Sequence, residues 1–293
     1  MLSTIIPPIA IVGAGRVGSA LGLALHAAGL PIAAVASRTS AHAAELAARV
    51  DAPHVGLFQA VRAPFVLFAV PDDAITTLAE LVADAQGWRA GQTVVHVSGA
   101  LPAGALAVAQ AQGALIGAWH PLAAFARRNQ PLPPGLTFAV EAAAPLHDTL
   151  HALTALLGGT PLDLAPAVKP LYHAAAVLVS NYSVVLTALA VQLLAHTATG
   201  PDAALAALLP LLATTLDNLR SQGLPAGLTG PLVRGDVGTV KQHMAALEQH
   251  EPQIAEVYRV LGNAALPRIA ARHDAATLTA LHSALAAPSV VEG

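Results

Sequence analysis

Apolar and polar positions in the first part of the chain follow two patterns, one typical of strands and one typical of helices. The first apolar run, residues 9–12, is rich in Ile and Val, as expected of a buried strand. After a turn, Val17, Leu21 and Leu25 recur at helical spacing until Gly29, a typical helix end. The chain therefore begins with a strand, a turn and a helix.

The same alternation continues to about residue 165. It predicts further strands at Ile32–Ser37, Phe65–Val70, Thr93–Val97 and Ala114–Ala118, with edge strands at Leu136–Val140 and Pro161–Leu164. It predicts helices at Ala41–Val50, capped by Ser40, and from Pro71 to about Asp84, capped by Asp72 or Asp73. Such regular alternation is typical of an α/β fold with a parallel, doubly wound sheet.

Beyond this point Ala and Leu at helical spacing replace the strand patterns. Gly200-Pro201 separates two long helices, and three or four more helices are expected between Asp236 and Ala286. The sequence thus predicts a sheet domain over residues 1–165 and an all-helical domain over residues 166–293.

Composition adds an expectation about assembly. Hydrophobic residues make up 55% of the 293 residues and charged residues only 11%, whereas roughly 25% of an average soluble protein is charged. This apolar excess predicts a homodimer formed mainly by the helical domain. A net charge of −3 without a basic cluster argues against nucleic acid as a partner.

The chain has no cysteine, which excludes disulfides and thiolate metal ligands. We expect no metal site. We also expect a cytoplasmic location, because no basic region precedes the first apolar run as it would in a signal peptide.

One stretch, residues 174–195, is apolar and long enough to cross a bilayer. It contains Ser180, Asn181, Ser183 and Gln192, and it lacks an aromatic belt and a Lys/Arg asymmetry at its ends. We interpret it as the central helix of a large core or of a dimer, and we expect no membrane partner.

The turn after the first strand reads Gly13-Ala14-Gly15-Arg16-Val17-Gly18. In a dinucleotide-binding turn the first glycine permits the reversal, the second lets a pyrophosphate approach, and the third allows close packing of helix on strand. The helix N-terminus adds amides and a partial positive charge. A glycine pattern is weak evidence in a chain with 23 glycines. With a strand before it and a helix after it, however, it predicts a dinucleotide-binding Rossmann domain.

The end of the second strand indicates which dinucleotide binds. NAD-binding chains normally place Asp or Glu there for the ribose 2′-hydroxyl. This chain has Ser37-Arg38-Thr39, and its nearest acid is Glu45 in the next helix. Arg38 can pair with a 2′-phosphate, and the two hydroxyls can donate to it. The pattern favours NADP over NAD, against the alternative of an exposed loop arginine.

Residues that follow the carboxyl ends of the strands are the first candidates for the chemistry. Ser98 and His120 each close an expected strand and are candidate catalytic residues facing the nicotinamide. The proline after His120 favours an extended backbone there. Val70 and Pro71 close another strand and are expected beside the cofactor. For a lone histidine, a structural role is the alternative.

A second candidate stretch opens the helical domain. Lys169, His173 and Ser180 share one helical face, with Asn181 at its edge. Polar groups on an apolar helix are costly to bury unless they are paired. We interpret this face as the proton donor, Lys169 or His173, and a substrate clamp that includes Asn181. The alternative is a hydrogen-bonded core stripe or a subunit contact.

A third stretch surrounds the turn Gly230-Pro231. Thr229 and the turn amides can bind an anion, and Arg234 suits a carboxylate, so both are candidate substrate-binding residues. Asp236 is expected to cap the following helix.

Several of these motifs occur together in one known family. They are the Gly13–Gly18 turn, Val70-Pro71-Asp72-Asp73, His96-Val97-Ser98-Gly99-Ala100, His120-Pro121-Leu122, Tyr172-His173-Ala174-Ala175-Ala176 with Ser180-Asn181-Tyr182, and Thr229-Gly230-Pro231 with Arg234-Gly235-Asp236. The set resembles bacterial Rossmann-like NADP-dependent oxidoreductases whose helical C-terminal domain is uncharacterised. That family is similar to ketopantoate reductases, pyrroline-5-carboxylate reductases and the 6-phosphogluconate dehydrogenase group.

The resemblance implies NADPH-dependent reduction of a small carbonyl, such as the 2-oxo acid ketopantoate, or of an imine, and helical domains that pair into a dimer. In ketopantoate reductases a helix lysine donates the proton and an asparagine follows four residues later. Lys169 matches the lysine, but position 173 is histidine. Thr229-Gly230-Pro231 resembles the Thr-Ser-Pro turn of pyrroline-5-carboxylate reductases, although the glycine-threonine run after it is incomplete.

Two other classes of function remain open. A non-catalytic NADP-binding sensor or regulatory protein would keep the glycine turn without a proton donor. A structural dimerisation protein would need neither, and the glycine turn argues against it.

Overall fold

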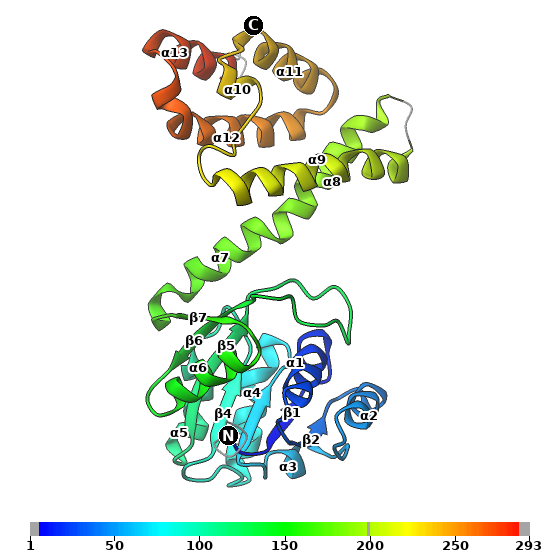
Figure 1. The fold of residues 1–293 in the computed structure, drawn as a ribbon, viewed down its shortest axis with the longest axis vertical. Coiled ribbons are helices and arrows are strands. Elements are labelled where there is room, and N and C mark those ends of the chain that lie inside the picture. The colour runs from blue at the N-terminus through cyan, green and yellow to red at the C-terminus, as the bar shows by residue number, and fades with distance from the viewer. Residues whose placement is uncertain (1–5, 198–199, 287–293) are drawn as a thin grey trace, which may run out of the picture. The chain divides into compact units, whose positions relative to one another are not determined.

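The computed structural model describes residues 6–197 and 200–286. The chain divides into two compact units, Met1–Ser180 and Asn181–Gly293 (Figure 1).

The first unit is built on a seven-stranded sheet with the strand order β2-β1-β3-β4-β5-β6-β7. The strands are β1 Ile9–Val12, β2 Ile32–Ala36, β3 Phe65–Phe68, β4 Thr93–His96, β5 Leu115–Pro121, β6 Thr137–Ala142 and β7 Thr160–Asp163. Every strand expected from the sequence is present, at nearly the expected residues.

The first five strands are parallel, whereas β6 runs antiparallel to β5 and β7 runs parallel to β6. The expected parallel sheet is therefore confirmed for the first five strands, and the edge strand β6 departs from it. The physical reason lies in the connection, because residues 122–136 form no helix. Parallel neighbours need a crossover, usually helical, whereas an antiparallel neighbour needs only a return of the chain.

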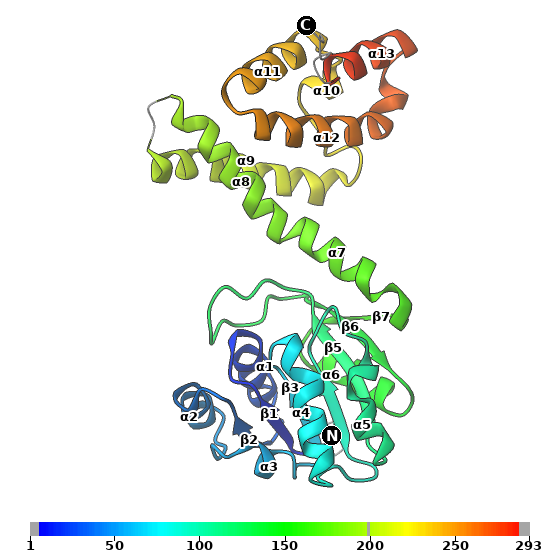
Figure 2. The ribbon, with the colours of Figure 1, turned by 180° about the vertical axis from the view of Figure 1, so that it is seen from behind.

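Helices cover both faces of the sheet, as a doubly wound fold requires (Figures 1 and 2). The helices of this unit are α1 Arg16–Ala27, α2 Ser40–Arg49, α3 Leu57–Ala60, α4 Asp72–Asp84, α5 Ala107–Ala111, α6 Leu146–Leu156 and α7 Lys169–Val179, with 3-10 turns η2 Ala103–Leu106 and η3 Pro166–Val168. Of these, α7 runs away from the sheet (Figures 1 and 2). In β1, Ile9 and Ile11 belong to one buried apolar cluster, and Ala10 and Val12 belong to another. This alternation shows that apolar cores lie on both faces of the strand.

Two expected helix caps are wrong. Ser40 is the first residue of α2, and Thr39 occupies the cap position without a side-chain hydrogen bond. Pro71 holds the cap position of α4, so Asp72 and Asp73 lie in its first turn. There the two carboxylates still interact favourably with the positive end of the helix dipole.

The last strand, β7, ends two residues before the boundary expected near residue 165. The compact unit extends further, to Ser180. Two contacts hold the start of α7 against the sheet: Lys169 pairs with Glu141 of β6, and Tyr172 contacts His120 of β5.

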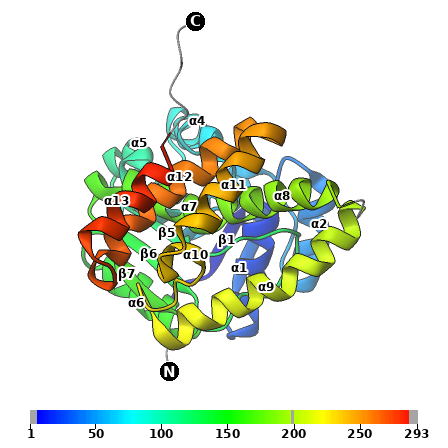
Figure 3. The same cartoon turned by 90° about the horizontal axis from the view of Figure 1, so that it is seen from above.

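All the regular elements in the described part of the second unit are helices, as the sequence predicts (Figure 3). Its helices are α8 Asn181–Ala195, α9 Pro201–Gln222, α10 Pro231–Arg234, α11 Val237–His250, α12 Pro252–Ile269 and α13 Ala275–Ala284, with a 3-10 turn, η4 Ala270–Arg272. Val240, Ile254 and Leu281, from α11, α12 and α13, belong to its buried core. The predicted cap of α11 is confirmed, because Asp236 Oδ1 accepts the Thr239 N–H at 3.0 Å.

The helix interpreted from the sequence as central to a core is not buried within the described chain. No residue of α8 is buried. Two segments, Pro166–Ala195 and Pro201–Gln222, are long and apolar enough to cross a membrane by length and composition, a test that core helices of soluble proteins also pass.

Candidate functional site

The glycine turn connects β1 to α1, and its three glycines have different surroundings. Gly13 has φ +110°, and a Cβ there would lie 2.2 Å from the carbonyl oxygen of Ala69. A Cβ on Gly18 would lie 1.8 Å from the Gly13 oxygen, whereas a Cβ on Gly15 would meet nothing within 4 Å. The backbone itself therefore requires Gly13 and Gly18, while Gly15 borders open space at the N-terminus of α1.

That open space belongs to a cavity of about 530 Å³ at the carboxyl ends of the first strands. Seven of the predicted cofactor residues line it: Gly13, Gly15, Ser37, Arg38, Thr39, Val70 and Pro71. The other four do not line it. Ala14 and Gly18 are buried between turn and helix, and Arg16 and Val17 belong to the first turn of α1.

Arg38 is exposed beside this cavity and forms no ion pair with any described residue. The nearest acid is engaged elsewhere, because Glu45 accepts hydrogen bonds from Arg128 at 2.8 Å and Asn129 at 2.6 Å. The Arg128 guanidinium holds the pKa of Glu45 below its ordinary value. His42, which no sequence pattern indicated, also lines the cavity from the first turn of α2.

A second group of polar side chains lies where β4 and β5 end. His96 is fully buried, and its Nδ1 accepts the Ser98 N–H at 3.2 Å. Its Nε2 therefore carries the proton and donates to the Pro102 oxygen at 3.0 Å. Burial lowers the pKa of His96 to about 4. Ser98 Oγ accepts the N–H groups of Ala100 and Leu101, so this predicted catalytic hydroxyl holds a turn.

His120 extends from β5 toward α7. The hydroxyl of Tyr172 forms a hydrogen bond with Nδ1 of His120 at 2.8 Å, and the two rings meet edge to face. Burial, with His173 and Lys169 nearby, lowers the pKa of His120 to about 4, and burial raises the pKa of Tyr172 to about 12. Both side chains are therefore neutral near neutral pH. Tyr172 is a site residue that the sequence analysis did not assign.

Lys169, at the start of α7, is 2% exposed, and its Nζ lies 3.2 Å from Oε2 of Glu141. The other carboxylate oxygen accepts the Ala103 N–H at 2.9 Å. Burial lowers the pKa of Lys169, and the charge of Glu141 opposes that change. Glu141 was also missed. It is a lone acid in an otherwise apolar strand, and such an acid is costly to bury without a partner.

His173 completes this group. Its Nδ1 is buried and has no hydrogen-bond partner among the described residues. The centroids of the His173 and His120 rings are 6.4 Å apart. A Cβ on Gly99 would lie 2.9 Å from His120 Nε2 and 3.0 Å from His173 Nδ1, so the missing side chain lets both rings approach this turn. The fold thus brings Lys169, His173, His120 and Ser98 together, and we name the group with Glu141 and Tyr172 the α7 cluster.

Three further predicted residues lie in the second unit. Asn181 begins α8 and is exposed, and Thr229 is exposed before α10. Arg234 is exposed, with Nη2 4.0 Å from Oδ2 of Asp236. Their part in the site stays a prediction.

Solved structures share this architecture. A provisionally assigned NADP oxidoreductase from Bacteroides fragilis is 27% identical, with a TM-score of 0.69 over 87% of this chain and 96% of that one. A Thermotoga maritima protein is 22% identical, with a TM-score of 0.65, and the match covers 83% of this chain and 91% of that one. An imine reductase from Aspergillus terreus, solved in complex with NADPH4, is 19% identical, with a TM-score of 0.57. The match covers 93% of this chain and 98% of that one.

No curated protein matches the sequence of the chain closely enough to be counted as a relative. Two family models do match it: a Rossmann-like domain over residues 5–121, and a domain of unknown function, DUF2520, over residues 136–265. The chain therefore combines a Rossmann-like domain with a DUF2520 domain.

Proposed function

We propose that this protein is a cytoplasmic NADP-dependent oxidoreductase that reduces a small carbonyl or imine. One observation carries the proposal: the glycine turn and Ser37-Arg38-Thr39 line the same cavity. The Bacteroides fragilis structure, described as an NADP oxidoreductase, supports the class of reaction. The Aspergillus terreus imine reductase shares the fold.

The residues around the cavity fit the cofactor. The open space at Gly15, beside the N-terminus of α1, suits a pyrophosphate, because the helix amides and dipole favour an anion. Arg38 is free to pair with a 2′-phosphate, and Ser37 and Thr39 add hydroxyl donors. NADPH supplies the hydride when bound.

The α7 cluster supplies the proton. Reduction leaves negative charge on the substrate oxygen or nitrogen, and a positioned acid typically contributes about 10²–10⁴-fold to such a step. We assign this role to Lys169 or His173. Burial brings the pKa of Lys169 closer to neutral, which favours donation. His173 offers a buried ring nitrogen that lacks a partner among the described residues.

Two other members of the cluster act as positioning residues. Glu141 holds the ammonium group of Lys169, and the Tyr172 hydroxyl fixes the ring of His120. For a 2-oxo acid such as ketopantoate, Arg234 and Thr229 are the proposed carboxylate contacts and Asn181 is a further polar contact, as expected from the sequence.

The first test compares NADPH with NADH by calorimetry, followed by a turnover screen of 2-oxo acids and cyclic imines. We expect wild-type protein to bind NADPH more tightly, and Arg38→Asp to erase or reverse that preference because it replaces the partner of the 2′-phosphate with an acid. Arg49→Asp is the matched control, since it makes the same charge change at the other end of α2. Equal binding of both cofactors by wild-type protein would contradict the NADP assignment.

The same screen separates the other classes of function. A sensor would bind NADPH without turnover of any carbonyl or imine, and a structural dimerisation protein would bind neither cofactor. The α7 cluster favours an enzyme, because several of its members have pKa values shifted by burial, as catalytic groups often do.

A further inference from the structure

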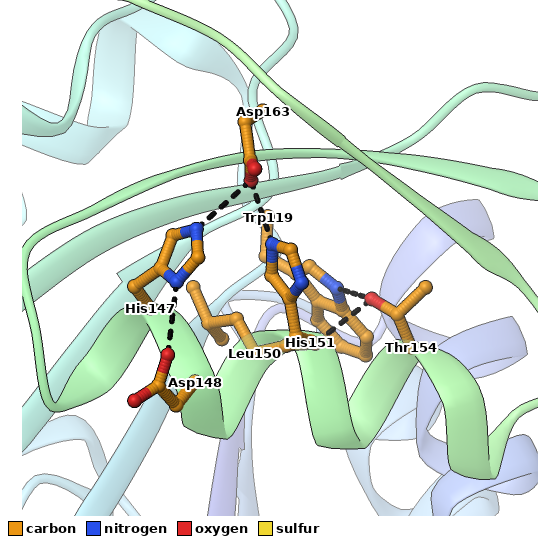
Figure 4. A network of polar contacts seen from close by, with 7 residues as sticks. All are labelled: Trp119, His147, Asp148, Leu150, His151, Thr154 and Asp163. Carbon is orange, nitrogen blue, oxygen red and sulfur yellow. Dashed lines mark hydrogen bonds and ion pairs between the residues drawn. The ribbon is translucent and has the colours of Figure 1, made fainter.

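Two histidines and an aspartate meet at the sheet edge, away from the cofactor cavity and the α7 cluster. His147 and His151 lie on α6, and Asp163 is the last residue of β7 (Figure 4). Oδ1 of Asp163 lies 3.0 Å from Nε2 of His147 and 2.6 Å from Nε2 of His151. One ligand atom from each residue falls within 4.8 Å of the others.

The helix explains why the two imidazoles converge. Residues four apart on a helix are neighbours on one face, and the two ring centroids are 4.1 Å apart. Asp163 comes from a different element, and it is paired with Val140 across β6 and β7. No sequence spacing indicates this meeting, which is why the sequence analysis expected no metal site.

The helix that carries the two histidines is firmly held. Leu150, on the inner face of α6, is fully buried. Thr154 Oγ1 accepts a hydrogen bond from Trp119 Nε1 at 2.8 Å, which fixes the next turn of α6 against β5 (Figure 4). Ligands on rigid, packed elements bind an ion with little rearrangement.

We propose that His147, His151 and Asp163 bind one divalent transition-metal ion, with Zn²⁺ as the best-suited ion. Two imidazole nitrogens and a carboxylate oxygen form a common zinc ligand set, and three protein ligands leave a fourth position for water. Zinc–ligand bonds are about 2.0–2.2 Å, so tetrahedral ligands lie about 3.3 Å apart. The present separations of 2.6 and 3.0 Å would therefore widen by about 0.7 and 0.3 Å.

A neighbouring carboxylate completes the arrangement. Nδ1 of His147 lies 3.1 Å from Oδ1 of Asp148 (Figure 4). A carboxylate that accepts the Nδ1 proton leaves Nε2 free for the metal, and metal-binding histidines almost always have such a partner. The three ligand side chains are partly exposed, so an ion can reach them from solvent.

The consequence of binding is a link between a helix and an edge strand. β7 is the last strand of the sheet and is largely exposed. An ion held by both α6 and β7 stabilises that edge, because a ligand bound only in the folded state raises its stability. None of the three ligands lines the proposed cofactor cavity.

The test uses full-length protein, freed of any affinity tag and stripped of metal. Equilibrium dialysis with Zn²⁺ should give one ion per chain, and Zn²⁺ should raise the melting temperature. Co²⁺ should give the intense visible absorption of a four-coordinate site. His147→Gln, His151→Gln and Asp163→Asn should each abolish binding of one ion. Asp148→Asn should weaken it by about 10–100-fold, because only the partner of a ligand is lost.

His26→Gln is the matched control, since His26 is another partly exposed histidine that faces an aspartate, Asp51, at 3.7 Å. It should bind Zn²⁺ like wild-type protein. The variants replace side chains that are at least partly exposed, so without metal their melting temperatures should stay close to that of wild-type protein. The proposal is overturned if wild-type protein takes up no Zn²⁺, or if the His147→Gln and His151→Gln proteins bind it as wild-type does.

Discussion

Lys169 and His173 are four residues apart on α7, and both lie in the cluster proposed to donate a proton. We expect Lys169→Ala and His173→Ala to keep their affinity for NADPH, because neither residue lines the cofactor cavity. At least one should lose about 100-fold or more in turnover, as expected for removal of a general acid. NADPH titration and steady-state kinetics with the substrate found in the screen measure the two effects, and Lys241→Ala on α11 is an exposed lysine control.

The pH dependence distinguishes the two donors. If Lys169 donates, its protonated form is the active one, so the reductive rate falls as pH rises. Burial lowers the pKa of Lys169, so this fall should begin below the ordinary lysine value of 10.5, and it should be absent from Lys169→Ala. Near wild-type rates in both alanine variants would make this helix face structural, with His120 and Ser98 as the leading candidates.

The lowered pKa of His96 makes the free energy of unfolding depend on pH. Its pKa is about 4 in the folded protein, below the ordinary 6.5, so the unfolded chain binds a proton first as pH falls. The contribution of His96 to the free energy of unfolding is therefore fully present above about pH 6.5. This contribution, at most about 3 kcal/mol, is lost as the pH falls from there to about 4. His96→Gln should reduce this pH dependence of the unfolding free energy.

Denaturant unfolding followed by tryptophan fluorescence measures this effect in the first unit alone, because both tryptophans, Trp88 and Trp119, lie there. His54→Gln, at an exposed histidine of the same unit, should leave the pH dependence unchanged. An identical slope for wild-type and His96→Gln protein would show that His96 is not the group responsible.

Among the elements, the turn between β1 and α1 contains one glycine required for packing, Gly18, and one proposed to border the cofactor, Gly15. Gly18→Ala forces a Cβ against the Gly13 carbonyl and should destabilise the first unit by about 1–3 kcal/mol, the usual cost of overpacking. Gly15→Ala meets open space, so stability should change by less than about 0.5 kcal/mol. NADPH affinity should nevertheless fall, since the new methyl group enters the space assigned to the pyrophosphate. Unfolding curves and NADPH titrations of both variants check this, and normal affinity in Gly15→Ala would place the phosphates elsewhere.

Local patterns predicted the elements well because each pattern is contained within its own segment. The run of Ile and Val before Gly13 and the residues Ser37-Arg38-Thr39 after β2 indicated both the strands and the cavity that they border. Strand direction is not contained in such patterns, so the reversal of β6 was missed. Glu141 was missed because its partner, Lys169, lies on a different element, and a contact between two elements is not contained in the pattern of either.

At the scale of the whole molecule, the described chain leaves large apolar side chains of α8 and α9 in contact with solvent. Leu186 is 40% exposed and Leu211 is 64% exposed, and both line a shallow groove between the two helices. Monomeric soluble proteins rarely expose large contiguous apolar patches. A second copy of the chain or a membrane would cover them.

We expect a second copy, because the apolar stretch carries polar residues and lacks the flanking features of a membrane span. A stable dimer interface buries about 1,200–2,000 Å² in total, and association through α8 and α9 would remove these leucines from water. Sedimentation equilibrium should therefore find wild-type dimers at micromolar concentration. Leu186→Asp and Leu211→Asp should shift the protein toward monomer, because an interface that buries them would also bury an unpaired charge. Leu81→Asp, at an exposed leucine of α4, should remain dimeric. A stable wild-type monomer that partitions into lipid vesicles would contradict the dimer and favour a membrane as the partner of these helices.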